Sequence, residues 1–112
     1  VIYDYHTAYI TITSEELKRC RYQKGDTEGI VNYGLGIKNV KFAAIFIEDE
    51  EQKIIKISLR SKGGFDVNQF SRNHCNGGGH INAAGGRSEL SLEQTVENFI
   101  QNLALYQEEL KK

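Results

Sequence analysis

The chain has 112 residues, of which 39% are hydrophobic and 26% charged, and its net charge is −1. This size allows one domain with a single modest core, so we expect residues 1–112 to form one unit. No apolar run approaches the roughly 20 residues that span a bilayer, which excludes a helical membrane protein. Cys20 and Cys75 are too few for a disulfide framework, and we expect a reduced, cytoplasmic protein.

The charges are unevenly distributed along the chain. Residues 53–87 carry six basic side chains and one acidic one, a net charge of +5. The segments on either side, 1–52 and 88–112, each carry a net charge of −3. A basic segment of this kind would attract an anionic ligand, and a chance fluctuation is the alternative explanation.

A strand and two short helices are predicted in the first part of the chain. Residues 7–13 (TAYITIT) alternate and are rich in β-branched side chains, which predicts a strand. Thr13 and Glu16 form a capping-box pattern, which predicts a helix running towards Tyr22. Residues 27–36 (TEGIVNYGLG) predict a second short helix that ends in glycine.

Two strands joined as a hairpin are predicted next. Residues 40–48 (VKFAAIFIE) are apolar at successive positions, as expected for a central strand covered on both faces. Residues 53–61 (KIIKISLRS) alternate, which places Arg60 with Ser58 on the polar face of the second strand. The intervening residues 49–52 (DEEQ) form the predicted turn.

A well-capped helix is predicted directly before the glycine-rich segment. It covers residues 65–75 (FDVNQFSRNHC), with Asp66 as its N-cap and Gln69 at the third position. Phe65 and Phe70 have the spacing of a hydrophobic staple, which would fix the angle at which the chain enters the helix.

The last part of the chain predicts a helical turn at 80–84 and then a long amphipathic helix. Ser91 and Gln94 form its capping box. Its apolar face consists of Leu92, Val96, Phe99, Ile100, Leu103 and Leu110. The predicted fold class is therefore α/β, a small mixed β-sheet with helices packed on it and a long C-terminal helix.

The glycine-rich segment has the composition of an anion-binding site. Gly77, Gly78 and Gly79 lack Cβ atoms, so their backbone N–H groups can approach a ligand closely. If a helix starts at His80, its free N–H groups and positive dipole end would point at the same place. His80 and Asn82 could each donate a further hydrogen bond to a phosphate or carboxylate. A flexible loop between two helices is the alternative.

Arg60 is the second candidate for binding an anion. Its guanidinium, near the end of a predicted strand, could hold a phosphate through two parallel hydrogen bonds, and an ordinary surface arginine is the alternative. A zinc site from His74, Cys75 and His80 is disfavoured, because the spacing is not that of a common structural site. We expect Cys75 to be a small buried residue at a helix end and predict no metal ligand in this chain.

Two stretches of the sequence are similar to a known family. Residues 58–61 (SLRS) and 65–86 (FDVNQFSRNHCNGGGHINAAGG) resemble the DHH-associated domain, the smaller C-terminal half of DHH-family phosphoesterases. Residues 27–48 resemble the preceding segment in the branch of oligoribonucleases (nanoRNases) and phosphoadenosine-phosphate phosphatases. Many family members carry a further glycine where this chain has Asn76.

The resemblance implies a division of labour between two domains. In the family an N-terminal DHH domain holds two divalent cations, usually Mn²⁺, and these activate the water that attacks a terminal phosphate ester. The associated domain holds the substrate's phosphate and nucleotide, and the matching positions here are Arg60 and His80 with the glycine backbone beside them. The chain has no methionine, begins at Val1 and has no Asp-His-His motif, so we expect a fragment that binds substrate but carries no catalytic residue.

Several functions remain open within this resemblance. The substrate would be a short 5′-phosphorylated oligonucleotide or 3′-phosphoadenosine 5′-phosphate, and the partner would be the N-terminal DHH domain of the same chain. The alternatives are a non-catalytic nucleic-acid-binding module, as in alanyl-tRNA synthetases, and a related enzyme acting on polyphosphate or cyclic dinucleotides. No membrane partner is expected, and the oligomeric state, including a homo-oligomer, is open.

Overall fold

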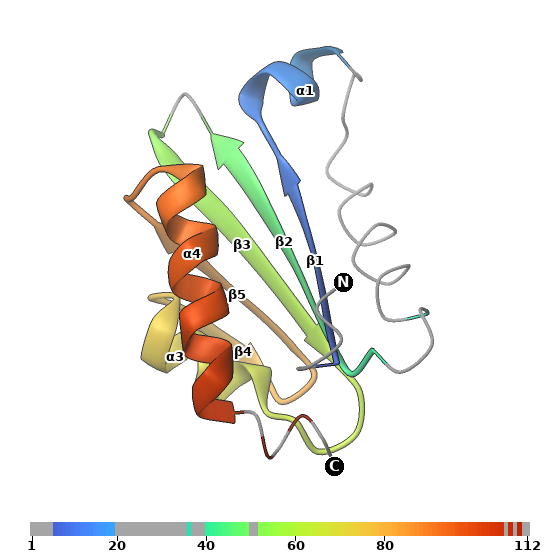
Figure 1. Cartoon of the computed structure of the whole chain (residues 1–112). Helices are drawn as coiled ribbons and strands as arrows, with labels where there is room; N and C mark the ends of the chain where they lie inside the picture. The colour runs from blue at the N-terminus through green and yellow to red at the C-terminus, as the bar shows by residue number, and fades with distance from the viewer. Residues whose placement is uncertain are drawn as a thin grey trace.

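The structure is a computed structural model that describes residues 6–19, 36, 40–49, 52–106, 108 and 110. Its centre is a five-stranded sheet in the order β1-β2-β3-β5-β4 (Figure 1). The strands are β1 (Thr7–Ile12), β2 (Phe42–Asp49), β3 (Ile54–Ser61), β4 (Gly78–His80) and β5 (Ala83–Ser88). β1 runs parallel to β2 and the remaining neighbours are antiparallel, so the predicted mixed α/β sheet is confirmed.

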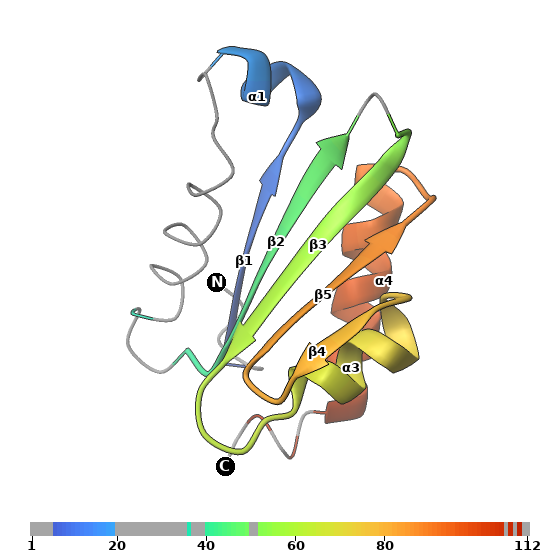
Figure 2. The ribbon, with the colours of Figure 1, turned by 180° about the vertical axis from the view of Figure 1, so that it is seen from behind.

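The described helices are α1 (Ser14–Arg19), α3 (Val67–His74) and α4 (Leu92–Leu103), which continues into the 3-10 turn η2 (Ala104–Tyr106). Helices α3 and α4 lie on the same side of the sheet, as the views from front and back agree (Figures 1 and 2). Within the described residues, no helix is long and apolar enough to cross a membrane.

The predicted helix starts are confirmed by their hydrogen bonds. The N–H of Thr13 donates to Glu16 Oε1 at 3.0 Å, and the N–H of Glu16 donates back to Thr13 Oγ1 at 3.1 Å. This reciprocal pair satisfies two donors that the start of a helix otherwise leaves free. The side chain of Asp66 caps α3 by accepting from the N–H of Gln69 at 3.0 Å.

The start of α4 forms only half of its predicted capping box. Ser91 Oγ accepts from the N–H of Gln94 at 3.1 Å, but the Gln94 side chain donates to Asn98 instead of returning to Ser91. The regular helix also ends earlier than predicted, at Leu103, although Leu110 is still buried in the same core.

The core lies between the sheet and the helices α3 and α4. Phe42 is fully buried, and its ring centroid lies 4.8 Å from that of Phe65, 5.2 Å from Phe70 and 5.6 Å from Phe99. The predicted staple is present, with the Phe65 and Phe70 centroids 6.4 Å apart. The opposite face of β2 is also buried, with Ala43, Ile45 and Ile47 in a second cluster, which confirms the predicted central strand.

The predicted helical turn at 80–84 is wrong. Gly78–His80 and Ala83–Ser88 form a β-hairpin, and β5 pairs with β3 along six positions. Glycine has low helix propensity, and Ala83 and Ala84 alone are too short a run to form a stable helix in water. The exposed edge of β3 offers a full ladder of hydrogen bonds, so tertiary pairing overrides the local preference of the alanines. The helix predicted at 27–36 lies outside the described residues except for Gly36.

Candidate anion-binding site

Arg60 and His80 lie in one row of the sheet although they are twenty positions apart in sequence. Arg60 in β3 pairs with Ala83 in β5, and Ala83 pairs with His80 in β4. Because neighbouring strands are about 4.8 Å apart, the backbones of Arg60 and His80 are separated by about 10 Å. Figure 2 shows β3, β5 and β4 in front, with α3 and α4 behind them. The structure therefore brings together the two side chains that the sequence singled out separately.

Arg60 extends from the polar face of β3, as predicted. Its row neighbours on either side are Ala43 and Ala83, so residues with small side chains lie on both sides of Arg60 in the sheet. The side chain is half-buried, and Nη1 donates to the carbonyl of Leu59 at 2.8 Å. Arginine presents several donors in a rigid planar fork, so this bond orients the guanidinium at the end of β3.

His80 is exposed at the end of β4, where the hairpin turns. Among the described residues, no side chain is bonded to its imidazole, so the ring can donate to an external acceptor. Because no helix starts at His80, free helical N–H groups and a helix dipole do not contribute to anion binding here, contrary to the prediction. What remains is a side-chain site formed by His80 and Arg60, with the hairpin turn between them.

Asn82 holds the hairpin turn in place rather than offering free donors. Its Nδ2 group donates to Ser61 Oγ at 2.9 Å and to the carbonyl of Gly63 at 3.1 Å. The backbone carbonyl of Asn82 accepts from the N–H of Ser61 at 3.1 Å. The backbone carbonyl of Ile81 accepts from the N–H of Val67 at 2.8 Å. Both amide hydrogens of Asn82 are thus used within the chain. These bonds favour a positioning role for Asn82, and its predicted contact with a ligand stays a prediction.

Close backbone packing explains several of the glycines. A Cβ atom on Gly77 would lie 2.0 Å from the carbonyl oxygen of Gly85, and one on Gly86 would lie 2.3 Å from the carbonyl oxygen of Cys75. A Cβ on Gly79 would lie 2.7 Å from the Cα of Ala84. Real Cβ contacts are never this short, so the backbones of residues 75–79 and 83–86 could not come together if these glycines carried side chains.

The remaining glycines have more space. The three atoms nearest to a Cβ on Gly78 would all be side-chain atoms of α3, the closest being Asn68 Oδ1 at 3.2 Å. A Cβ on Gly85 would have the carbonyl oxygen of Ile57 at 3.4 Å and nothing else within 4 Å. The N–H of Gly79 donates to Asn68 Oδ1 at 2.9 Å, so this backbone donor is engaged within the chain.

Asn76 occupies a left-handed backbone conformation, with φ of 55°. It follows Cys75, the C-cap of α3. Glycine adopts this conformation without cost and asparagine tolerates it better than most residues. This explains why a glycine and an asparagine can exchange at this position of the motif.

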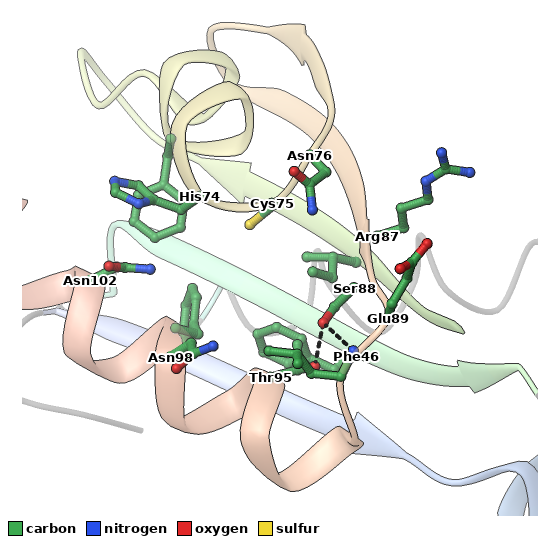
Figure 3. Close-up of a pocket in the computed structure, with 14 residues that line it drawn as sticks. Phe46, His74, Cys75, Asn76, Arg87, Ser88, Glu89, Thr95, Asn98 and Asn102 are labelled. Carbon is green, nitrogen blue, oxygen red and sulfur yellow. Dashed lines mark hydrogen bonds between the residues drawn. The ribbon is translucent and has the colours of Figure 1, made fainter. Parts of the chain in front are cut away.

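His74 and Cys75 lie on the other side of the sheet, around a cavity of about 460 Å³ between α3 and α4 (Figure 3). His74 Nε2 is 2.9 Å from the hydroxyl of Tyr106, and burial lowers the pKa of His74. Burial raises the pKa of the Cys75 thiol to about 12, which makes it an unreactive core residue at a helix end, as predicted. In the part of the chain that the structure describes, no three His, Cys, Asp or Glu side chains converge as a metal site.

Two further cations were not singled out from the sequence. Lys56 in β3 and Arg87 in β5 are direct partners in the ladder that contains Arg60 and Ala83. The net charge of +5 over residues 53–87 signalled that cations gather in this region. The charge pattern could not show that Lys56 and Arg87 are neighbours, because that depends on which strand pairs with β3.

Comparisons with known proteins agree with this architecture. The model of the DHHA1 domain family matches residues 6–109. An exopolyphosphatase-related protein from Bacteroides fragilis is similar over the whole chain, with 46% sequence identity and a TM-score of 0.93. The chain spans 32% of the length of that protein.

A second solved structure shares the fold at lower similarity. It is an uncharacterized protein from Helicobacter pylori, with 22% identity over 86% of this chain and 25% of its own, and a TM-score of 0.57. No curated protein matches the chain. Since the family model covers nearly all of the described fold, the chain belongs to the DHHA1 domain family.

Proposed function

We propose that this chain is the substrate-binding half of a metal-dependent phosphoesterase of the DHH family. Its substrate would be a short 5′-phosphorylated oligonucleotide or 3′-phosphoadenosine 5′-phosphate. The observation that carries the proposal is the row formed by Arg60, Ala83 and His80, which offers two strong donors on either side of a small side chain. Hydrogen bonds from an arginine to phosphate are charge-assisted and stronger than neutral ones.

The chain's own residues would bind and orient the substrate. A terminal phosphate would lie over Ala83, with the Arg60 guanidinium on one side and the His80 imidazole on the other. The bonds of Asn82 to Ser61 and Gly63 hold the turn that carries His80, so little ordering would be required when the ligand binds.

The metal chemistry would belong to a different domain. The described residues offer no convergent set of metal ligands, and the chain spans about a third of the length of its Bacteroides relative. We propose that an N-terminal DHH domain of the same protein holds Mn²⁺ or another divalent cation. Bound there, the metal would activate the attacking water. On this proposal the 112-residue chain binds substrate without hydrolysing it.

Polyphosphate is a second candidate substrate. The observation in its favour is the description of the Bacteroides relative as exopolyphosphatase-related, at 46% identity. Polyphosphate and oligonucleotides both present repeated phosphates, so the row of Arg60 and His80 would suit either.

The proposal is tested by NMR titration of the ¹⁵N-labelled chain with a 5′-phosphorylated dinucleotide. We expect shifts concentrated at Arg60 and in the turn at 80–83, and we expect them to be lost in His80→Ala. Ile81→Ala is a matched control, because it truncates the neighbouring exposed side chain of the same turn without removing a donor.

The result that counts against the proposal is equally specific. If His80→Ala and Ile81→Ala bind the dinucleotide as tightly as the unmodified chain, the imidazole takes no part in binding. Replacing the dinucleotide by inorganic polyphosphate in the same titration distinguishes the two candidate substrates by their affinities.

A further inference from the structure

A second cationic pair lies further along the strands that carry the proposed phosphate site. Lys56 and Arg87 are direct partners in the β3–β5 ladder, four positions before Arg60 on β3 and four after Ala83 on β5. Side chains alternate along a strand, so Lys56 shares the face of Arg60. With a rise of about 3.3 Å per residue, the two ends of this face are roughly 13 Å apart.

The pairing of Lys56 with Arg87 is unfavourable for the protein alone. Like charges directly opposite one another in a ladder repel. Asp49 Oδ2 lies 3.2 Å from Lys56 Nζ and balances that charge in part, although the Lys56 side chain is 54% exposed. Arg87 is exposed, and among the described residues no carboxylate contacts its guanidinium. A bound anion would relieve this repulsion.

The surface between the two cationic ends carries small side chains and is not covered by any described helix. Ser58 pairs with Gly85, and both have small side chains or none. A Cβ on Gly85 would have open space beyond the carbonyl of Ile57. Figure 2 shows that α3 and α4 lie behind β3 and β5 and that no described helix crosses these strands in front. An extended ligand could therefore lie along the strands from one cationic end to the other.

We propose that Lys56 and Arg87 form a second anion subsite, which binds a later phosphate of a substrate whose terminal phosphate is held by Arg60 and His80. This inference rests on the proposed function and narrows the range of candidate substrates. A ligand that reaches both ends must carry phosphates separated by roughly 13 Å. The two phosphates of a nucleoside bisphosphate are attached to one sugar and cannot span this distance. The ligand is thus a linear molecule with repeated phosphates, either an oligonucleotide or a polyphosphate.

The subsite is tested by combining ligand length with an Arg87→Gln variant. The 112-residue chain is titrated calorimetrically with adenosine 5′-monophosphate, a 5′-phosphorylated tetra-adenylate and a linear polyphosphate. We expect Arg87→Gln to weaken tetra-adenylate binding at least about tenfold, because one charge-assisted contact is lost. Binding of the monophosphate should stay within about twofold, because it occupies only the first subsite.

Lys53→Asn is the matched control for the loss of one positive charge. Lys53 is exposed in the β2–β3 turn with φ of 56°, a conformation that asparagine tolerates. For tetra-adenylate, Arg87→Gln should also reduce the slope of log affinity against log salt by about 0.7, and Lys53→Asn should not. Equal tetra-adenylate affinities and salt slopes for the two variants would overturn the second subsite.

The two proposals fail in different ways in this experiment. If His80→Ala leaves monophosphate binding unchanged while Arg87→Gln still weakens tetra-adenylate binding, the proposed phosphate site at His80 is overturned, and Lys56 and Arg87 bind phosphate independently of it. If His80→Ala abolishes monophosphate binding while the effect of Arg87→Gln does not depend on ligand length, the proposed function stands and the second subsite is overturned. Tetra-adenylate and polyphosphate both carry repeated phosphates. The one that binds more tightly then shows whether the natural ligand is an oligonucleotide or a polyphosphate.

Discussion

Two adjacent glycines, Gly85 and Gly86, should respond in opposite ways to the same substitution. A Cβ on Gly86 would lie 2.3 Å from the carbonyl oxygen of Cys75 and 2.7 Å from its Cβ. The same carbonyl accepts the N–H of Arg87 at 2.8 Å. Gly86→Ala must therefore move a backbone segment and weaken that hydrogen bond.

The expected cost follows from these contacts. Forcing a methyl group into a packed site costs about 1–3 kcal/mol, and a lost backbone hydrogen bond adds about 1 kcal/mol. We expect Gly86→Ala to lower the free energy of unfolding by about 2–4 kcal/mol. Gly85→Ala has space for its methyl group, and alanine restricts the unfolded chain, so its free energy of unfolding should be unchanged or higher by up to about 1 kcal/mol.

Urea unfolding followed by far-UV circular dichroism measures both values. With a slope of about 1–3 kcal/mol per molar urea, the midpoint for Gly86→Ala should fall by on the order of 1–2 M relative to Gly85→Ala. Equal midpoints would refute the reasoning that the glycines serve close backbone packing. Because Gly85 lies on the face proposed for the ligand, Gly85→Ala should still weaken tetra-adenylate binding.

Three further predictions concern stability. Asn82→Ala should lower the free energy of unfolding by about 1–2 kcal/mol, since two hydrogen bonds that hold the hairpin turn are lost, and an unchanged urea midpoint would contradict this. Arg87→Gln should leave the free energy of unfolding unchanged or raise it by a few tenths of a kcal/mol, because the repulsion with Lys56 is removed; a clear loss on urea unfolding would show that Arg87 stabilises the fold instead. The raised pKa of Cys75 predicts stability that is complete below pH 9 and declines between pH 9 and about 12, because the thiol ionises in the unfolded chain and not in the folded one. Between pH 9.5 and 10.5 the difference in unfolding free energy between the unmodified chain and Cys75→Ala should fall by about 1.2 kcal/mol, and a constant difference would exclude this linkage.

The sequence by itself determined the features that depend on near neighbours along the chain. The caps at Thr13 and Asp66 and the staple between Phe65 and Phe70 each involve side chains within five positions of one another. The pattern of 40–48 was sufficient to identify a strand covered on both faces, because burial on two sides leaves no room for polar residues.

Only the tertiary structure decided the features that depend on strand pairing. The alanines at 83 and 84 favour a helix locally, but the free edge of β3 provides a ladder for β5, and that pairing is invisible in the segment's own sequence. The same pairing places His80 in the row of Arg60 and Arg87 opposite Lys56. Local sequence thus indicated which side chains could bind an anion, whereas the register of β3, β5 and β4 decided which of them can act together, since that register is set by contacts between residues distant in the chain.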